Sequence, residues 1–153
     1  MAYRIEGLAP EAFESLFELS DAELAARNAR RAVADGPSFP CRISLEEAGV
    51  GEELVLVNHV SNDVETPFRA AHAIFVRKNA KQGSCTDTVP ALFETRTLGL
   101  RGFDAEGMLR GALLALPGEA DAKIRELLER PEIASIHAHN AALGCFLARI
   151  ERN

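Results

Sequence analysis

The sequence predicts an α+β fold with a mostly antiparallel sheet. Two observations support this class: segments with helical spacing lie near the N-terminus and before the last two strands, and neighbouring strand-like segments fill the middle of the chain. The 153 residues match the length of one ordinary domain, and no repeat, low-complexity tract or linker divides them. We therefore expect a single domain over residues 1–153.

Two helices are predicted near the N-terminus. Pro10 suits the first turn of a helix whose following apolar residues keep helical spacing. Ser20 and Glu23 form the pattern of a capping box, so a second helix should begin there. The basic run at 27–31 falls in this helix-like segment, and we interpret it as a solvated face.

The rest of the chain has the pattern of strands interrupted by one helix. The predicted strands are residues 3–8, 39–44, 53–60, 72–78, 91–100, 108–116, 133–139 and 145–152, with a turn at 104–107. The helix is predicted over 119–130, because its apolar residues form one stripe, acids occupy its first turn and Pro131 ends it.

The last two strands are predicted to form a hairpin with the loop 140–144. A register that places His139 opposite Cys145 also puts apolar pairs on one face: Ala138 with Phe146, Ile136 with Ala148, and Ala134 with Ile150. A sheet face that packs on a core needs this pattern, and a slip of one residue would destroy it. His137, His139 and Cys145 would then share the opposite face with Arg149, and we expect His139 and Cys145 to be paired or one step from paired.

This hairpin could bring a thiol and an imidazole together. Directly opposed residues have Cβ atoms about 4.5–5.5 Å apart, and an adjacent imidazolium stabilises a thiolate. Cys145 would then be the nucleophile, His139 its base and Asn140 an orienting residue. Packing is the alternative role for Cys145, since free cysteines are usually buried and inert.

Arg42 and His72 are two further candidates, both for substrate binding. On the predicted strand 39–44, Cys41 faces the core and Arg42 the other side, where a guanidinium can clamp a small anionic ligand bidentately. An ion pair with one of the 23 acidic residues is the alternative for Arg42. His72 lies at the entrance of a strand, where a loop hydrogen bond is its alternative role. Neither His59 nor Cys85 receives a role.

Composition limits the class of protein. The net charge of −6 argues against a nucleic-acid partner and against an anionic membrane surface. The odd count of three cysteines favours a reducing compartment, and the N-terminus lacks the apolar stretch of a signal peptide, so we expect a cytoplasmic protein. No phosphate loop, zinc-protease or hydrolase motif is present, and we expect no cofactor and no metal.

Four blocks of the sequence together resemble a bacterial family known only as domain of unknown function 1203. The blocks are residues 39–45, 66–76, 100–104 and 136–146, in the order of that family. Phe68 stands where the family pattern often has Tyr, which removes a phenol from the site. The resemblance implies one compact domain and selects Arg42, His72, His139, Asn140 and Cys145, but it implies no mechanism.

Three interpretations follow. The first is an enzyme or small-ligand binder whose site gathers these five residues on one sheet face. The second is a metal site that uses His137, His139 and a sulfur or imidazole from Cys41, His59 or His72. The third is a non-catalytic interaction or ligand-binding module. The sequence leaves open which of them holds, whether the protein is an enzyme, and what its oligomeric state is.

Overall fold

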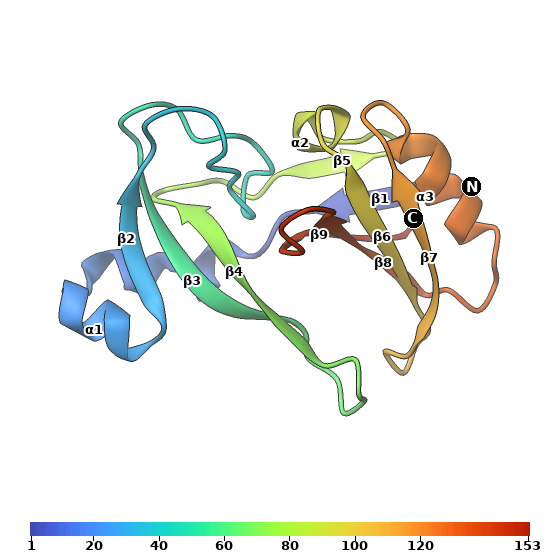
Figure 1. Cartoon of the computed structure of the whole chain (residues 1–153), viewed down its shortest axis with the longest axis horizontal. Coiled ribbons are helices and arrows are strands. Elements are labelled where there is room, and N and C mark those ends of the chain that lie inside the picture. Colours follow the sequence, from blue (N-terminus) through green and yellow to red (C-terminus); the bar gives the residue numbers. More distant parts are fainter.

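The computed structural model describes all residues from 1 to 153, and it contains two antiparallel sheets that lie side by side (Figure 1). The larger sheet has the strand order β5-β1-β9-β8-β6-β7, and the smaller has the order β2-β3-β4. The strands of the two sheets are β1 (Tyr3–Glu6), β2 (Ala29–Val33), β3 (Glu53–Asn62), β4 (Ala70–Arg77), β5 (Ser84–Thr86), β6 (Leu98–Phe103), β7 (Leu109–Ala115), β8 (Ser135–Asn140) and β9 (Phe146–Arg152). The helices are α1 (Asp21–Ala26), α2 (Ala91–Glu94) and α3 (Ala120–Leu128). The predicted α+β class is confirmed.

The N-terminal segment is less helical than predicted. The helix expected from Pro10 is two short 3-10 turns, Pro10–Ala12 and Glu14–Glu18. The capping box is confirmed: Ser20 Oγ accepts from the Glu23 N–H at 3.2 Å, and α1 begins after it. The basic run does not continue this helix, because Asn28 takes a left-handed φ of 53° and residues 29–33 form β2.

Two predicted strands are wrong in part. Residues 39–44 form turns with isolated bridges at Pro40 and Cys41, because the Leu45 N–H bonds back to the Cys41 carbonyl and Leu45 takes a φ of 61°. Residues 91–94 form the short helix α2 after Pro90, and only the end of the predicted strand 91–100 belongs to β6.

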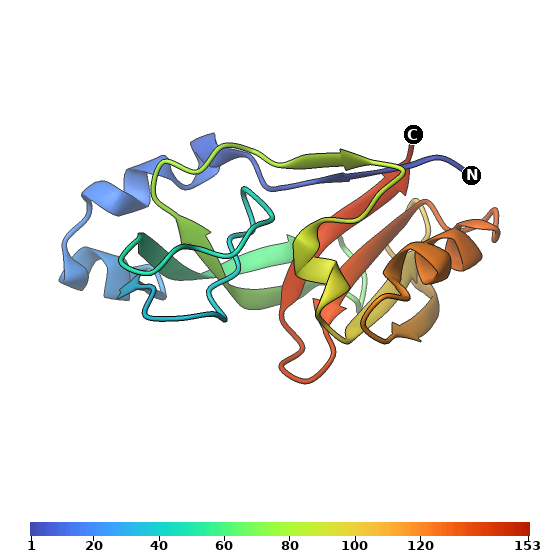
Figure 2. The same cartoon turned by 90° about the horizontal axis from the view of Figure 1, so that it is seen from above.

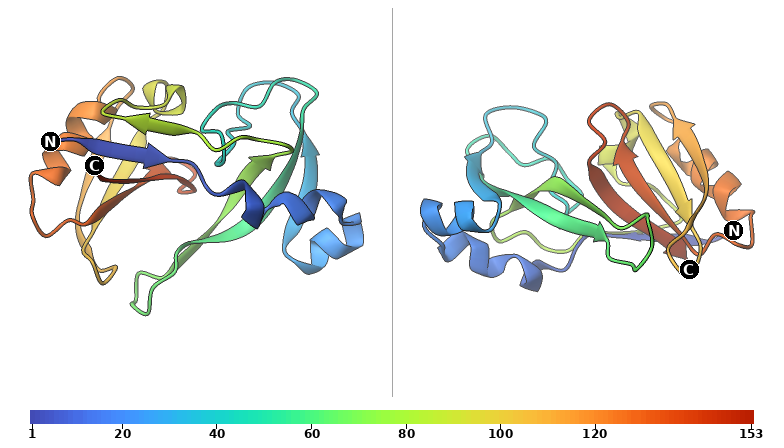
Figure 3. Two further views of the ribbon diagram at one scale, coloured as in Figure 1. Left: turned by 180° about the vertical axis from the view of Figure 1, so that it is seen from behind. Right: turned by 60° about the horizontal axis from the view of Figure 1, so that its bottom comes forward.

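Each sheet covers its own core. In the larger core, α3 packs on one face of the six-stranded sheet, as Figures 1 and 2 show. In the smaller core, the N-terminal helical turns and α1 cover the three-stranded sheet, which Figure 3 shows from behind. Phe146 of β9 belongs to this second core, so its ring links the two sheets. None of the helices is long and apolar enough to cross a membrane.

Candidate functional site

The four histidines of the chain meet where the two sheets face each other. His59 and His72 are directly paired across β3 and β4, while β8 carries His137 and His139. The His72 and His139 rings are 4.8 Å apart between centroids, and the His137 and His139 rings are 6.5 Å apart. The sequence interpretation treated His59 as the end of a buried strand and named it only as an alternative metal ligand.

The C-terminal hairpin is confirmed, with Cys145 one step from the residue that pairs with His139. The predicted apolar pairs Ala138–Phe146, Ile136–Ala148 and Ala134–Ile150 are wrong, because Ala138 pairs with Ala148 and Ile136 with Ile150. His139 pairs with Phe146, and a bulge at Ala138/His139 separates this pair from the rest of the ladder. The loop before it turns on Gly144, which has a φ of 79°, so Cys145 precedes β9. Phe146 consequently lies beside the histidine rings and in the core of the smaller sheet, instead of facing the larger core.

His139 and His137 are buried and neutral. The Nδ1–H of His139 donates to the Gly144 carbonyl at 3.0 Å, which leaves its Nε2 as the acceptor nitrogen. Burial lowers the pKa of His139 to about 4, and burial with the nearby Arg149 lowers the pKa of His137 to about 3. The buried His137 Nδ1 has no hydrogen-bond partner.

His72 lies in front of His139 and is held by a serine. Its Nδ1 is 2.9 Å from Ser61 Oγ. Burial lowers the pKa of His72, and the positive charge of Arg101 lowers it further. The ring is therefore a neutral imidazole near pH 7, with a free Nε2.

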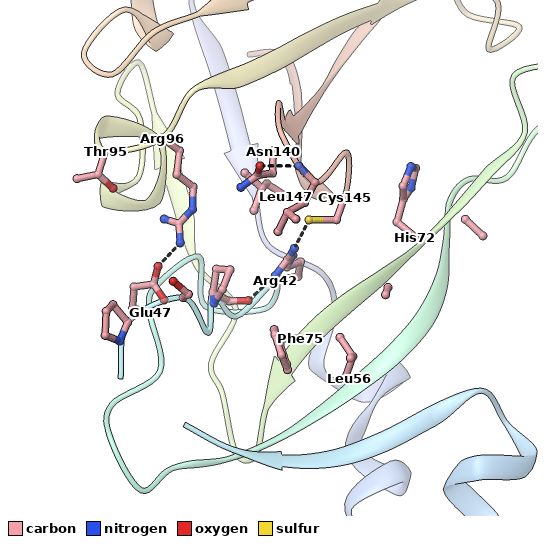
Figure 4. Close-up of a pocket in the computed structure, with 16 residues that line it drawn as sticks. Arg42, Glu47, Leu56, His72, Phe75, Thr95, Arg96, Asn140, Cys145 and Leu147 are labelled. Atoms are coloured by element: carbon pink, nitrogen blue, oxygen red, sulfur yellow. Dashed lines mark hydrogen bonds and ion pairs between the residues drawn. The ribbon is translucent and has the colours of Figure 1, made fainter. Parts of the chain in front are cut away.

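A cavity of about 810 Å³ opens beside His72, and we call it the Arg42 cavity (Figure 4). It lies between the 37–47 loop, strands β3 and β4, the residues after α2, and the β8–β9 loop. Four predicted site residues line it: Arg42, His72, Asn140 and Cys145. His139 does not line this cavity, but its ring contacts His72 from behind.

Main-chain contacts fix the loop that carries Arg42. The Arg42 N–H donates to the Phe75 carbonyl of β4 at 3.0 Å, and the Arg42 carbonyl accepts from the Leu8 N–H at 2.8 Å. Two glycines allow this close approach, since a Cβ on Gly7 would lie 1.8 Å from the Ile43 carbonyl oxygen and one on Gly83 would meet the Ser44 carbonyl. The Arg42 side chain is therefore attached to a main chain that is held in place.

The Arg42 side chain is 2% exposed and contacts no carboxylate. Its Nε donates to the Phe146 carbonyl at 2.8 Å, its Nη1 to the Pro40 carbonyl at 2.7 Å, and its Nη2 to Cys145 Sγ at 3.3 Å. The carboxylate that lines the cavity, Glu47, is paired with Arg96 instead. The predicted alternative, an ion pair between Arg42 and an acid, is therefore wrong.

The Cys145 sulfur is the ionisable group in contact with this cation. Burial lowers the pKa of Arg42, and the neighbouring sulfur opposes that shift. A guanidinium nevertheless remains protonated in proteins. The cavity thus holds a buried positive charge whose partners are two neutral carbonyls and one half-buried thiol.

Asn140 shapes the loop that carries Cys145. Its Oδ1 accepts from the N–H groups of Ala142 and Leu143, each at 3.1 Å, so this oxygen orients no imidazole. The sequence interpretation missed Ser61, Glu47 and Arg96. None of them lies in a recognisable motif, and only the folded structure shows that they are close to the site.

The metal alternative receives no support from the arrangement of ligands. No group of three or more His, Cys, Asp and Glu side chains is placed to hold a metal ion. The four histidine rings lie along the contact between the two sheets and do not converge on one point where an ion could bind.

Comparison with known proteins gives one match. Residues 38–152 match the model of a family described as "Protein of unknown function (DUF1203)". No curated protein and no solved structure matches the chain. The matched range contains the whole Arg42 cavity except Pro37.

Proposed function

The chain belongs to the DUF1203 family, which has no assigned activity, and we propose that its Arg42 cavity binds a small anionic ligand beside a reactive Cys145. One observation carries this proposal: the Arg42 guanidinium is buried, and no carboxylate of the protein neutralises it. The cavity of about 810 Å³ is within the range of small-molecule sites.

A buried charge without a counter-charge is costly, so an anion that reaches Arg42 would be strongly favoured. Nη1 and Nη2 each carry a second N–H beyond the one they donate to the protein. Two such donors in one plane match the two oxygens of a carboxylate or a phosphate. Arg42 is therefore the anchor for the ligand.

Cys145 supplies the nucleophile in this proposal. A cation beside a sulfur favours the thiolate, which is the reactive form of cysteine. Nη2 of Arg42 is 3.3 Å from the sulfur. Arg42 thus takes the place that the sequence interpretation gave to His139.

His72 is the proton acceptor in this proposal. It lines the same cavity as Cys145, Ser61 fixes its Nδ1, and its Nε2 remains free. Its lowered pKa keeps the imidazole neutral and therefore able to accept a proton near pH 7. His139 packs against His72 and holds the ring in position.

The proposal is tested by alkylation with iodoacetamide, followed residue by residue by mass spectrometry. Cys145 should react faster than Cys85, whose thiol pKa is raised by burial. Arg42→Gln should slow Cys145 at least about tenfold, and Arg42→Lys, which keeps a cation, should slow it less.

The matched control is Arg96→Gln, since Arg96 lines the same cavity but is paired with Glu47. This variant should leave the rate at Cys145 close to that of the unmodified protein. Equal rates at Cys145 and Cys85 in the folded protein would show that the thiol is structural, and the proposal would then be wrong.

A further inference from the structure

The outer edge of β4 is unpaired where it borders the Arg42 cavity. β4 ends its sheet, and only β3 pairs with it along its length. The Phe75 carbonyl points away from β3, because it accepts from the Arg42 N–H. Alternate residues of a strand point their main-chain groups the same way, so Ala73 and Ala71 also turn theirs outward, and no protein group bonds them there.

This edge lacks the features that usually protect a sheet edge. Exposed edges commonly carry lysine, proline or a covering loop. Residues 70–76 of β4 contain neither lysine nor proline, and the side chains of Ala71 and Ala73 are small and exposed. β2, β5 and β7 also end their sheets, but none of these three strands contributes a residue to the cavity.

The protein's own chain already adds to one end of this edge. Cys41 forms a parallel bridge with Phe75, and Arg42 follows it into the cavity. Beyond this bridge the edge is free along Ala73 and Ala71. From Ala71 to Phe75 a strand rises about 13 Å, at about 3.3 Å per residue, which is the length of about four residues of extended chain.

We propose that the anionic ligand is the C-terminal end of an extended peptide, which adds to the free edge of β4 in the parallel direction. Its main chain pairs with Ala71 and Ala73, and its terminal carboxylate is held by Arg42. Strand addition gives affinity through main-chain hydrogen bonds, and a guanidinium binds a carboxylate bidentately. This inference rests on the proposed function, because it names the ligand class of the same cavity.

The probe is N-acetyl-tetraalanine with a free carboxylate, and the readout is its protection of Cys145 from iodoacetamide. Acetate serves as the small-anion probe, which tests Arg42 alone. The tetrapeptide should protect at a concentration at least about tenfold lower than acetate, because it adds main-chain hydrogen bonds to the same carboxylate contact. Its C-terminal amide should protect far less.

Two changes test the strand pairing separately. Methylating each peptide nitrogen in turn should weaken protection at least about fivefold at a nitrogen that pairs with β4. Ala73→Pro should weaken protection by the tetrapeptide as well, since it removes an outward N–H. Proline is tolerated on edge strands, and N-methylation does not depend on how this variant folds.

The outcomes separate the inference from the proposed function. If acetate protects Cys145 but the tetrapeptide protects no better and no N-methyl group matters, the peptide inference is wrong and the anion site stands. If neither probe protects, both fail. Concentration-dependent dimers that Ala73→Pro abolishes, without peptide protection, would assign the edge to a second copy of the chain and overturn the inference.

Discussion

The buried histidines should make the stability of the protein fall steeply between pH 7 and pH 5. Burial lowers the pKa of His139 to about 4 and that of His137 to about 3, from an ordinary value of 6.5. The unfolded chain therefore binds more protons than the folded protein below about pH 6.5. Stability is complete above that pH and is lost as the pH falls toward the folded-state pKa values.

The size of the effect follows from these values. Each of these two histidines contributes a loss of about 2 kcal/mol between pH 7 and pH 5, so together they lower the free energy of unfolding by about 4 kcal/mol. The pKa values of His59 and His72 are also lowered, so these two residues add to the loss over the same pH range. Carboxylates with lowered pKa values, such as Asp121, destabilise the fold mainly at lower pH. Urea denaturation at a series of pH values measures the loss.

His137→Phe isolates one of the two contributions. The new ring cannot titrate, it packs among the aromatic neighbours Phe103 and Phe146, and the Nδ1 it removes has no hydrogen-bond partner. The loss between pH 7 and pH 5 should fall by about 2 kcal/mol, the contribution of His137. An unchanged loss in this variant would refute the reasoning, because His137 would then titrate alike in the folded and unfolded states.

Two other substitutions test contacts that support the site and the core. Gly83→Ala places a Cβ 2.2 Å from the Ser44 carbonyl oxygen. The clash should lower the free energy of unfolding, measured by urea denaturation, by about 1–3 kcal/mol. It should also slow the alkylation of Cys145, because it displaces the loop that carries Arg42. Tyr3→Phe removes a 2.6 Å hydrogen bond from a fully buried ring to Asp121 and should cost about 1–3 kcal/mol; unchanged stability would show that water replaces this bond without loss.

Much of the fold could be predicted because local patterns determine it. The capping box at Ser20, the apolar stripe of α3 and the C-terminal hairpin each depend on residues close together in sequence. The errors arose where a single residue overrode the pattern. Asn28 takes a left-handed backbone conformation and ends α1, and Pro90 starts a helix inside an apolar run.

The sequence selected residues that the fold brings to one cavity, but it did not predict the contacts between them. Arg42, His72, Asn140 and Cys145 line one cavity, although no local pattern relates them across the chain. The predicted pairs of the hairpin were shifted by two residues along β8, because alternation alone fits either register, and periodicity could not show the bulge beside His139. The contact between Arg42 and Cys145 spans 103 positions, so only the fold reveals it.

Alkylation by two reagents of different charge tests the central claim most directly. Iodoacetate carries a carboxylate and iodoacetamide does not, so the ratio of their rates reports whether the cavity attracts an anion to Cys145. We expect this ratio to be at least about tenfold higher at Cys145 than at Cys85, and to fall to the value of Cys85 in Arg42→Gln. Equal ratios at the two cysteines in the unmodified protein would contradict an anion site at Arg42.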